Sequence, residues 1–137
     1  GEFMSLTYSV AEQLVKTVAA VALRNRKSVA IAVTDGHGEL LHFVKMDGAS
    51  LMAGSLARAK AYTAAREGQA TLDMGTWARE NQRDVQYWAD SNVTLFGGGV
   101  PVTFEGHTLG AVGVSGLSEL EDHQIAANAI ATVMKLS

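Results

Sequence analysis

Cysteine is absent from this chain of 137 residues, and proline occurs once. Without cysteine there is no disulfide framework and no thiolate metal site, and the four histidines stand singly rather than at the spacing of metal-ligand pairs. No cross-link is needed, because a domain of this size buries roughly two thirds of the surface that its unfolded chain exposes. We therefore expect a single domain over residues 4–137, and we interpret Gly1-Glu2-Phe3, before Met4, as a cloning scar.

Positive charge and long apolar runs are also scarce. The formal net charge of −3 removes the attraction to phosphates that non-specific nucleic-acid binding requires. Every run of about eighteen residues contains a charged residue or a glycine, so no segment has the character of a membrane-spanning helix. Because no signal peptide follows Met4, we expect a soluble, cytoplasmic protein without nucleic-acid or membrane partners.

Apolar residues recur with two periods along the chain, and the alternation between these periods outlines the fold. Steps of three and four residues predict amphipathic helices, whereas steps of two predict strands. The predicted elements are, in chain order, a helix at 7–26, strands at 29–34 and 39–46, helices at 51–67 and 76–90, strands at 100–104 and 108–115, and a helix from 118 to about 134. Two hairpins in one antiparallel sheet, with helices over it, indicate the α+β class rather than the doubly wound α/β class.

Local signals mark several of these boundaries. Asp35-Gly36-His37-Gly38 has the turn chemistry of a β-hairpin, and Glu105-Gly106-His107 has the same character in the second hairpin. Thr7 or Ser9 is a suitable cap for the first helix. Ser118-Glu119-Leu120-Glu121 matches a capping box, which predicts the start of the last helix.

Glycine is concentrated in one segment, since seven of the 14 glycines lie between residues 95 and 116. Gly106 suits a hairpin turn, while Gly110 and Gly113 suit strand positions where a helix approaches closely. The run Gly97-Gly98-Gly99 needs another reason, because each glycine costs about 0.5–1 kcal/mol relative to alanine. Bare amides here either form a concavity for an anion or a flat ligand, or form a bulged entry into an edge strand.

Two side chains are candidates for contacting a ligand. His42 falls on the apolar face of a predicted strand, where a neutral imidazole is either a core residue or a ligand of haem or metal. Lys60, in the alanine-rich helix, either points its ammonium toward a carboxylate near Gly97-Gly98-Gly99 or extends to the surface as a solvated lysine. Arg58 and Arg66 lie off the same stripe and are interpreted as solvated.

The remaining polar residues carry weaker signals. Glu119, Glu121, Asp122 and His123 offer metal ligands within five residues, but acidity at a helix start already follows from the helix dipole and the capping box. No Ser-His-Asp order, carboxylate pair or cysteine nucleophile can be placed with a defined geometry. The residues therefore do not indicate an enzyme and do not identify a metal site.

The segment 76–90 is polar apart from Trp77, Val85 and Trp88, which lie near one face of the predicted helix. Large aromatic side chains dominate the energetics of protein interfaces. This face is therefore either a subunit contact or a surface packed on the chain's own sheet.

Four segments together resemble one protein family. They are IAVTDGHGELLHFVKMDGA (31–49), ARAKAYTAA (57–65), FGGGVPV (96–102) and LGAVGVSG (109–116), with Asp122 following. In this order, and over nearly the whole chain from Thr7, they resemble the GlcG/HbpS family, which includes the C-terminal domain of PduO-type proteins. The chain departs from the family pattern at Ala59, where relatives often carry an acidic residue, and at Leu117, where glycine is common.

The resemblance implies a profilin-like fold, with helices packed on a five-stranded antiparallel sheet in the order α-β-β-α-α-β-β-β-α. Residues 93–96, VTLF, are available as the additional strand. The resemblance also implies a homo-oligomer, from dimer to octamer.

The functional implication is a non-catalytic module that binds a small ligand, since some members resemble haem-binding proteins and the PduO domain is associated with haem or corrinoid chemistry. The candidate cofactor-binding residues are His42, Lys60, Gly97, Gly98 and Gly99. Two alternatives stay open. One is an accessory enzyme or sensor acting on a small hydroxy or keto acid in glycolate or diol metabolism, with Lys60 as anion binder or base. The other is a ligand-free oligomeric scaffold.

Overall fold

The computed structural model describes residues 5–135, so the interpretation of Gly1-Glu2-Phe3 lies outside the described residues. The elements are, in chain order, helix α1 (Tyr8–Arg24), strands β1 (Ala30–Asp35) and β2 (Leu40–Lys45), helices α2 (Leu51–Glu67) and α3 (Thr71–Glu80), the 3-10 helix η1 (Val85–Trp88), strands β3 (Gly99–Phe104) and β4 (His107–Ser115), and helix α4 (Glu119–Lys135). Among the described residues, no helix combines the length and the apolar character needed to cross a membrane.

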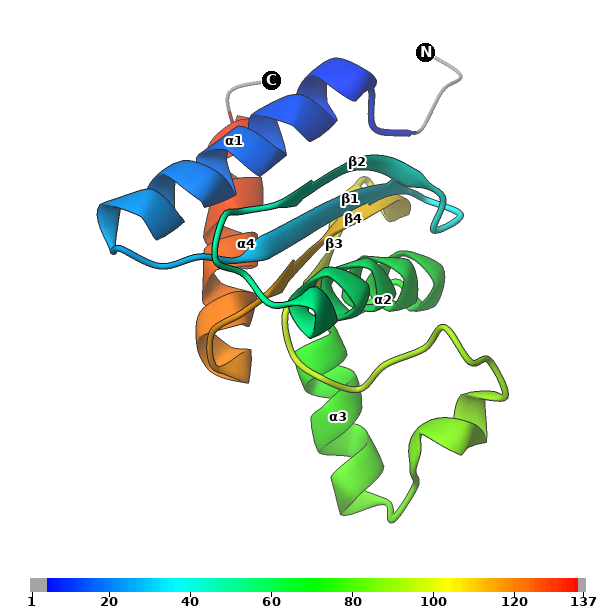
Figure 1. Ribbon diagram of the computed structural model, residues 1–137. Helices are drawn as coiled ribbons and strands as arrows, with labels where there is room; N and C mark the ends of the chain where they lie inside the picture. The colour runs from blue at the N-terminus through cyan, green and yellow to red at the C-terminus, as the bar shows by residue number, and fades with distance from the viewer. Residues whose placement is uncertain (1–4, 136–137) are drawn as a thin grey trace.

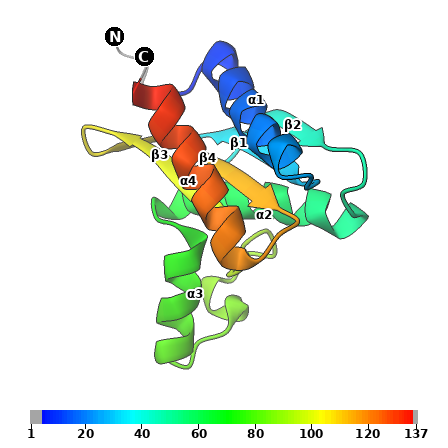
Figure 2. The same ribbon diagram turned by 90° about the vertical axis from the view of Figure 1, so that its left-hand side faces the viewer.

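The four strands form one antiparallel sheet in the order β2-β1-β4-β3, which confirms the α+β class. Helices α1 and α4 lie on one face of the sheet, and α2 lies across the other (Figure 1, Figure 2). Helix α3 continues away from the sheet beyond α2, and the segment that returns from it to β3 loops outward (Figure 1). The helices therefore form two layers, with the sheet between them.

The central strand β1 contributes to a different core on each face, because successive side chains of a strand point to opposite sides. Ile31 and Val33 are fully buried in the core that α1 and α4 cover, whereas Ala30 and Ala32 are buried under α2. The α2 residues in this second core are also alanines, namely Ala53, Ala57 and Ala61. Small side chains on both surfaces let α2 lie close to the strands.

The helix starts follow the local signals in the sequence. Thr7 caps α1, since its hydroxyl accepts the Val10 amide at 3.2 Å. At α4, the Ser118 amide donates to Glu121 Oε1 and the Glu121 amide donates to Ser118 Oγ, both at 3.2 Å, so the predicted capping box is confirmed. Such caps satisfy amides that the helix itself leaves without partners.

The single helix predicted at 76–90 is wrong. Helix α3 begins at Thr71 and ends at Glu80, and η1 follows after the chain reverses. The Asn81 side-chain amide donates to the Trp77 carbonyl at 2.8 Å, and Gln82 has a positive φ of 55°, so the helix does not continue. The reversal still brings Trp88 to Trp77, with ring centroids 6.1 Å apart.

The fifth strand predicted at 93–96 is also wrong, because this segment does not join the sheet that the structure describes. Its backbone bonds to side chains instead: the Thr94 amide donates to Thr63 Oγ1 on α2 at 3.0 Å. Strand β3 therefore remains an edge of the sheet, where Pro101 is tolerated because an edge strand needs fewer backbone donors.

We expect Gly113→Ala to destabilise the protein more than Gly106→Ala. A Cβ at Gly113 would overlap the Ala57 carbonyl oxygen and lie 2.6 Å from the Ala61 amide nitrogen, so α2 would have to move. Overpacking of this kind costs about 1–3 kcal/mol or more. Gly106 has a positive φ of 81° but no atom within 4 Å of the added Cβ, so its substitution should cost about 1 kcal/mol. Urea denaturation of both variants measures the difference, and equal losses would contradict the close approach of α2.

Candidate functional site

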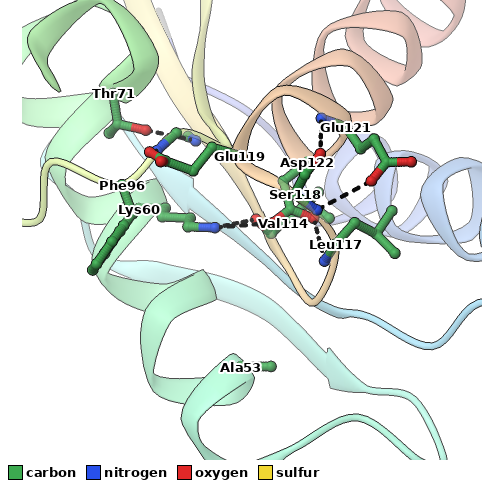
Figure 3. Close-up of polar contacts among 12 residues, drawn as sticks. Ala53, Lys60, Thr71, Phe96, Val114, Leu117, Ser118, Glu119, Glu121 and Asp122 are labelled. Atoms are coloured by element: carbon green, nitrogen blue, oxygen red, sulfur yellow. Dashed lines mark hydrogen bonds and ion pairs between the residues drawn. The ribbon is translucent and has the colours of Figure 1, made fainter. Parts of the chain in front are cut away.

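Lys60 and Asp122 form a buried ion pair that joins α2 to α4. The Lys60 Nζ lies 3.1 Å from Asp122 Oδ2 and donates to the Val114 carbonyl oxygen at 2.9 Å (Figure 3). Their side chains are only 3% and 2% exposed. Lys60 is therefore neither a solvated surface lysine nor a cation that points into an open pocket.

Burial governs the protonation of this pair. Loss of hydration lowers the pKa of Lys60 and raises the pKa of Asp122, while the attraction between the two charges opposes both shifts. Desolvation is the larger effect for each group. The pair is therefore costly to bury, and removing one partner would leave the other charge without compensation.

The run Gly97-Gly98-Gly99 packs around this pair. A Cβ on Gly98 would lie 2.9 Å from Lys60 Nζ and 3.0 Å from Asp122 Cβ, and a Cβ on Gly99 would overlap the Lys60 carbonyl. The Gly97 amide donates to Glu119 Oε1 at 2.7 Å, and the Gly99 amide donates to Thr71 Oγ1 at 2.9 Å. In this arrangement the bare main chain faces its own core, and two of its amides already have partners.

His42 lies on the opposite face of the sheet from Lys60. It faces α1, where its ring stacks on Tyr8 with centroids 6.2 Å apart. A β-bulge in the β1–β2 ladder interrupts the alternation, so Leu40 does not share the face of His42 as strict alternation along the strand would require. Within one chain, the structure therefore brings Lys60 and the glycine run together but separates both from His42.

A groove of about 470 Å³ opens on the α2 side of the sheet. Four segments of the chain supply its lining residues: Thr34, Gly38, Leu40, Ser55, Arg58, Ala59, Tyr62, Ser91 and Asn92. The Tyr62 hydroxyl donates to Asp90 Oδ2 at 2.6 Å, which holds the loop after η1 against α2 and raises the pKa of Tyr62. Sequence reasoning missed this groove, because its polar residues are far apart in the chain and individually resemble ordinary surface residues.

The acidic residues at the start of α4 have separate structural roles. Asp122 pairs with Lys60, Glu119 accepts the Gly97 amide, and Glu121 completes the capping box. Asp122 also accepts the Leu117 amide at 3.0 Å (Figure 3). No three metal-ligating side chains converge within residues 5–135.

Comparison with known proteins shows which family the chain belongs to. Residues 6–131 match the family described as "Haem degrading protein HbpS-like". The chain belongs to the HbpS-like family. A 15.0 kDa protein from the dhaT-dhaS intergenic region of Citrobacter freundii is 30% identical to this HbpS-like chain, over 94% of the chain and 92% of that protein.

Two further relatives are GlcG, which the match covers over most of its length, and PduO, which the match covers only in part. Protein GlcG of Escherichia coli (strain K12) is 35% identical over 110 residues, which make up 80% of this chain and 81% of GlcG. The corrinoid adenosyltransferase PduO of Citrobacter freundii is 30% identical over 95% of this chain, but the match spans 39% of PduO.

Solved structures agree with this assignment. The Klebsiella pneumoniae protein ORFY has a TM-score of 0.88 and 28% identity, with coverage of 96% of this chain and 92% of that chain. The PduOC:heme complex has a TM-score of 0.84 and 28% identity, with coverage of 93% and 94%. The predicted resemblance to GlcG, HbpS and PduO is therefore confirmed for this HbpS-like chain.

We expect Asp122→Leu alone to lower the free energy of unfolding by about 3–5 kcal/mol, because it leaves the Lys60 ammonium buried without a counter-charge. Lys60→Met alone should have a similar effect on Asp122. The double variant should lose much less than the sum of the two, since it buries no charge. Urea denaturation of the three variants and the wild type gives the coupling energy. Losses that simply add would contradict the coupling.

Proposed function

We propose that this HbpS-like chain is a non-catalytic module that binds haem. The word haem in the family description and the likeness to the PduOC:heme complex support haem binding, and the lack of a catalytic arrangement in the sequence is the reason for proposing a non-catalytic module. The matched residues include β2, which carries His42. A haem site must supply an axial ligand for the iron and a flat apolar surface for the ring.

His42 is the axial ligand that we propose. Its side chain is half-buried on the edge strand β2, and within residues 5–135 its imidazole has no hydrogen-bond partner. The adjacent Tyr8 ring, which is 66% exposed, offers an aromatic surface beside it. Neutral imidazole is a common axial ligand, and a bound haem would supply the iron for it. His42 and Tyr8 therefore supply two kinds of group that haem contacts, an imidazole and an aromatic ring.

Lys60 and Gly97-Gly98-Gly99 have a different role in this proposal. Their polar groups bond to one another and to neighbouring elements, so they hold α4 and the start of β3 rather than contact the haem. The groove beside α2 fits haem less well, since its lining contains no histidine, methionine or cysteine, and the hydroxyl of Tyr62 already bonds to Asp90.

We expect hemin to give a saturable shift of the Soret band with the wild-type protein. His42→Ala should lower the affinity about tenfold or more, because the iron loses its axial imidazole, a change equivalent to about 1.4 kcal/mol. His107→Ala is the matched control, since His107 is an exposed histidine in the β3–β4 hairpin. Absence of a saturable shift in the wild type would reject the proposal, and an unchanged His42→Ala titration would reject the role of His42. A parallel cobalamin titration tests the corrinoid alternative.

We also propose that copies of the chain associate through α3, η1 and the loop before β3. Trp77, Tyr87 and Phe96 in this region are 42%, 58% and 54% exposed, and large apolar side chains that are exposed in one region, rather than singly, are typical of a surface that meets a partner. A cleft of about 340 Å³ lies beside them, and its apolar lining is Val85, Val93, Leu95 and Phe96. Aromatic residues in such clusters contribute strongly to interfaces. A second copy of this chain is the partner that we propose.

We expect light scattering coupled to size exclusion to give a mass above the 14.5 kDa of one chain. Tyr87→Glu with Phe96→Glu should return the mass to that of a monomer, because two charges would have to be buried. Leu51→Glu is the control, since Leu51 is 85% exposed but lies at the start of α2. A monomeric wild type would contradict association, and an oligomeric Tyr87/Phe96 variant would contradict this surface.

A further inference from the structure

We propose that the groove beside α2 binds a small carboxylate that also carries a hydroxyl or oxo group. This site is separate from the haem site proposed above, because the groove lies on the α2 side of the sheet whereas His42 faces α1. The chemistry of the groove is also different, since its lining combines one arginine with several hydroxyl and amide groups.

Thr34 is the observation that points to a ligand. Its side chain is 2% exposed, and its Oγ1 is buried without a hydrogen-bond partner among the described residues. A buried hydroxyl without a partner is destabilising, and nearly all such groups in proteins are paired. Thr34 lines the groove, so an oxygen of a bound molecule would supply the partner that the protein does not.

Arg58 supplies the positive charge. Its guanidinium carbon lies 5.3 Å from the centroid of the Phe43 ring, so the planar group is stacked on a half-buried aromatic side chain. Stacking orients a guanidinium while its N–H donors at the edge remain available for a bidentate carboxylate. Within the part of the chain that the structure describes, no carboxylate forms an ion pair with Arg58.

One wall of the groove is already fixed before a ligand arrives. The Tyr62 hydroxyl is bonded to Asp90, and the Asn92 amide donates to the other oxygen of the same carboxylate at 2.9 Å. Arg66 stacks on the Tyr62 ring at 5.2 Å. Ser91 and Asn92, which line the groove, therefore belong to a loop that is held against α2. A preformed wall lowers the entropy that binding would otherwise lose.

The ligand class follows from the number and kind of these groups. One arginine matches one carboxylate, and the Thr34 hydroxyl matches a second oxygen on the same small molecule. The volume of about 470 Å³ lies within the usual range for small-molecule sites. We expected Lys60 to bind an anion, but Lys60 is bonded to Asp122, and Arg58 is the cation among the lining residues of the groove.

Isothermal titration calorimetry of the haem-free protein tests the proposal with three related molecules. Lactate carries both the carboxylate and the hydroxyl, propionate lacks the hydroxyl, and lactamide lacks the charge. We expect lactate to bind saturably and about five- to tenfold more tightly than propionate, since one neutral hydrogen bond is lost. Lactamide should give no saturable heat, because it cannot pair with Arg58.

Two variants assign the contacts. Thr34→Val keeps the shape of the side chain, and because the hydroxyl has no partner in the protein, the variant should fold normally. Its affinity for lactate should fall to that for propionate. Arg58→Gln should weaken both carboxylates at least tenfold. Arg83→Gln is the matched control, because Arg83 also stacks on an aromatic ring, at 5.3 Å from that of Tyr87, but does not line the groove.

The outcomes that would overturn the proposal are as follows. No saturable heat with lactate, or equal lactate affinity in wild type and Arg58→Gln, would overturn the proposal. If Thr34→Val retained the preference for lactate over propionate, the hydroxyl contact would be overturned. Hemin is absent from these titrations and His42 is unchanged, so this proposal and the haem proposal fail independently.

Discussion

The buried ion pair between Lys60 and Asp122 is the constraint on which the rest of the structure depends. Helices α2 and α4 lie on opposite faces of the sheet, so a side chain from one reaches the other only past the end of the strands. At that place the main chain carries no Cβ, because residues 97–99 are glycines. The pair therefore helps to account for Gly98, while Gly97 and Gly99 leave room for Glu119 and for the main chain of α2.

The same interaction sets the geometry of the neighbouring segments. The second oxygen of the Asp122 carboxylate holds the Leu117 amide, so the turn before α4 is tied to the pair. Lys60 also donates to the carbonyl oxygen of Val114, near the end of strand β4. One buried contact thus fixes a helix start, a strand end and the approach of α2. A mobile or solvated lysine would fix none of these, because water would compete for each of its bonds.

The sheet divides the molecule into two chemical environments. On the α1 side, His42 and Tyr8 present an imidazole and an aromatic ring. On the α2 side, Arg58 and the buried hydroxyl of Thr34 line a polar groove. The alternation of β1 and β2 produces this division, and a single β-bulge assigns Leu40 to the groove instead of the histidine face. The haem and the carboxylate that we propose would therefore contact different residues.

The sequence by itself determined the class of the fold, both hairpins, the alanine-rich helix and the capping box of α4, because these depend on periodicity and on residues close together in the chain. It also carried the family motifs. Tertiary structure alone decided that residues 76–90 reverse direction, that 93–96 bond to Thr63 of α2 rather than to a strand, and that Lys60 meets Asp122. It also decided that His42 stands apart from Lys60. Apart from the reversal near Asn81, these outcomes depend on contacts between residues tens of positions apart, and no local pattern records which buried charge or hydroxyl will find a partner.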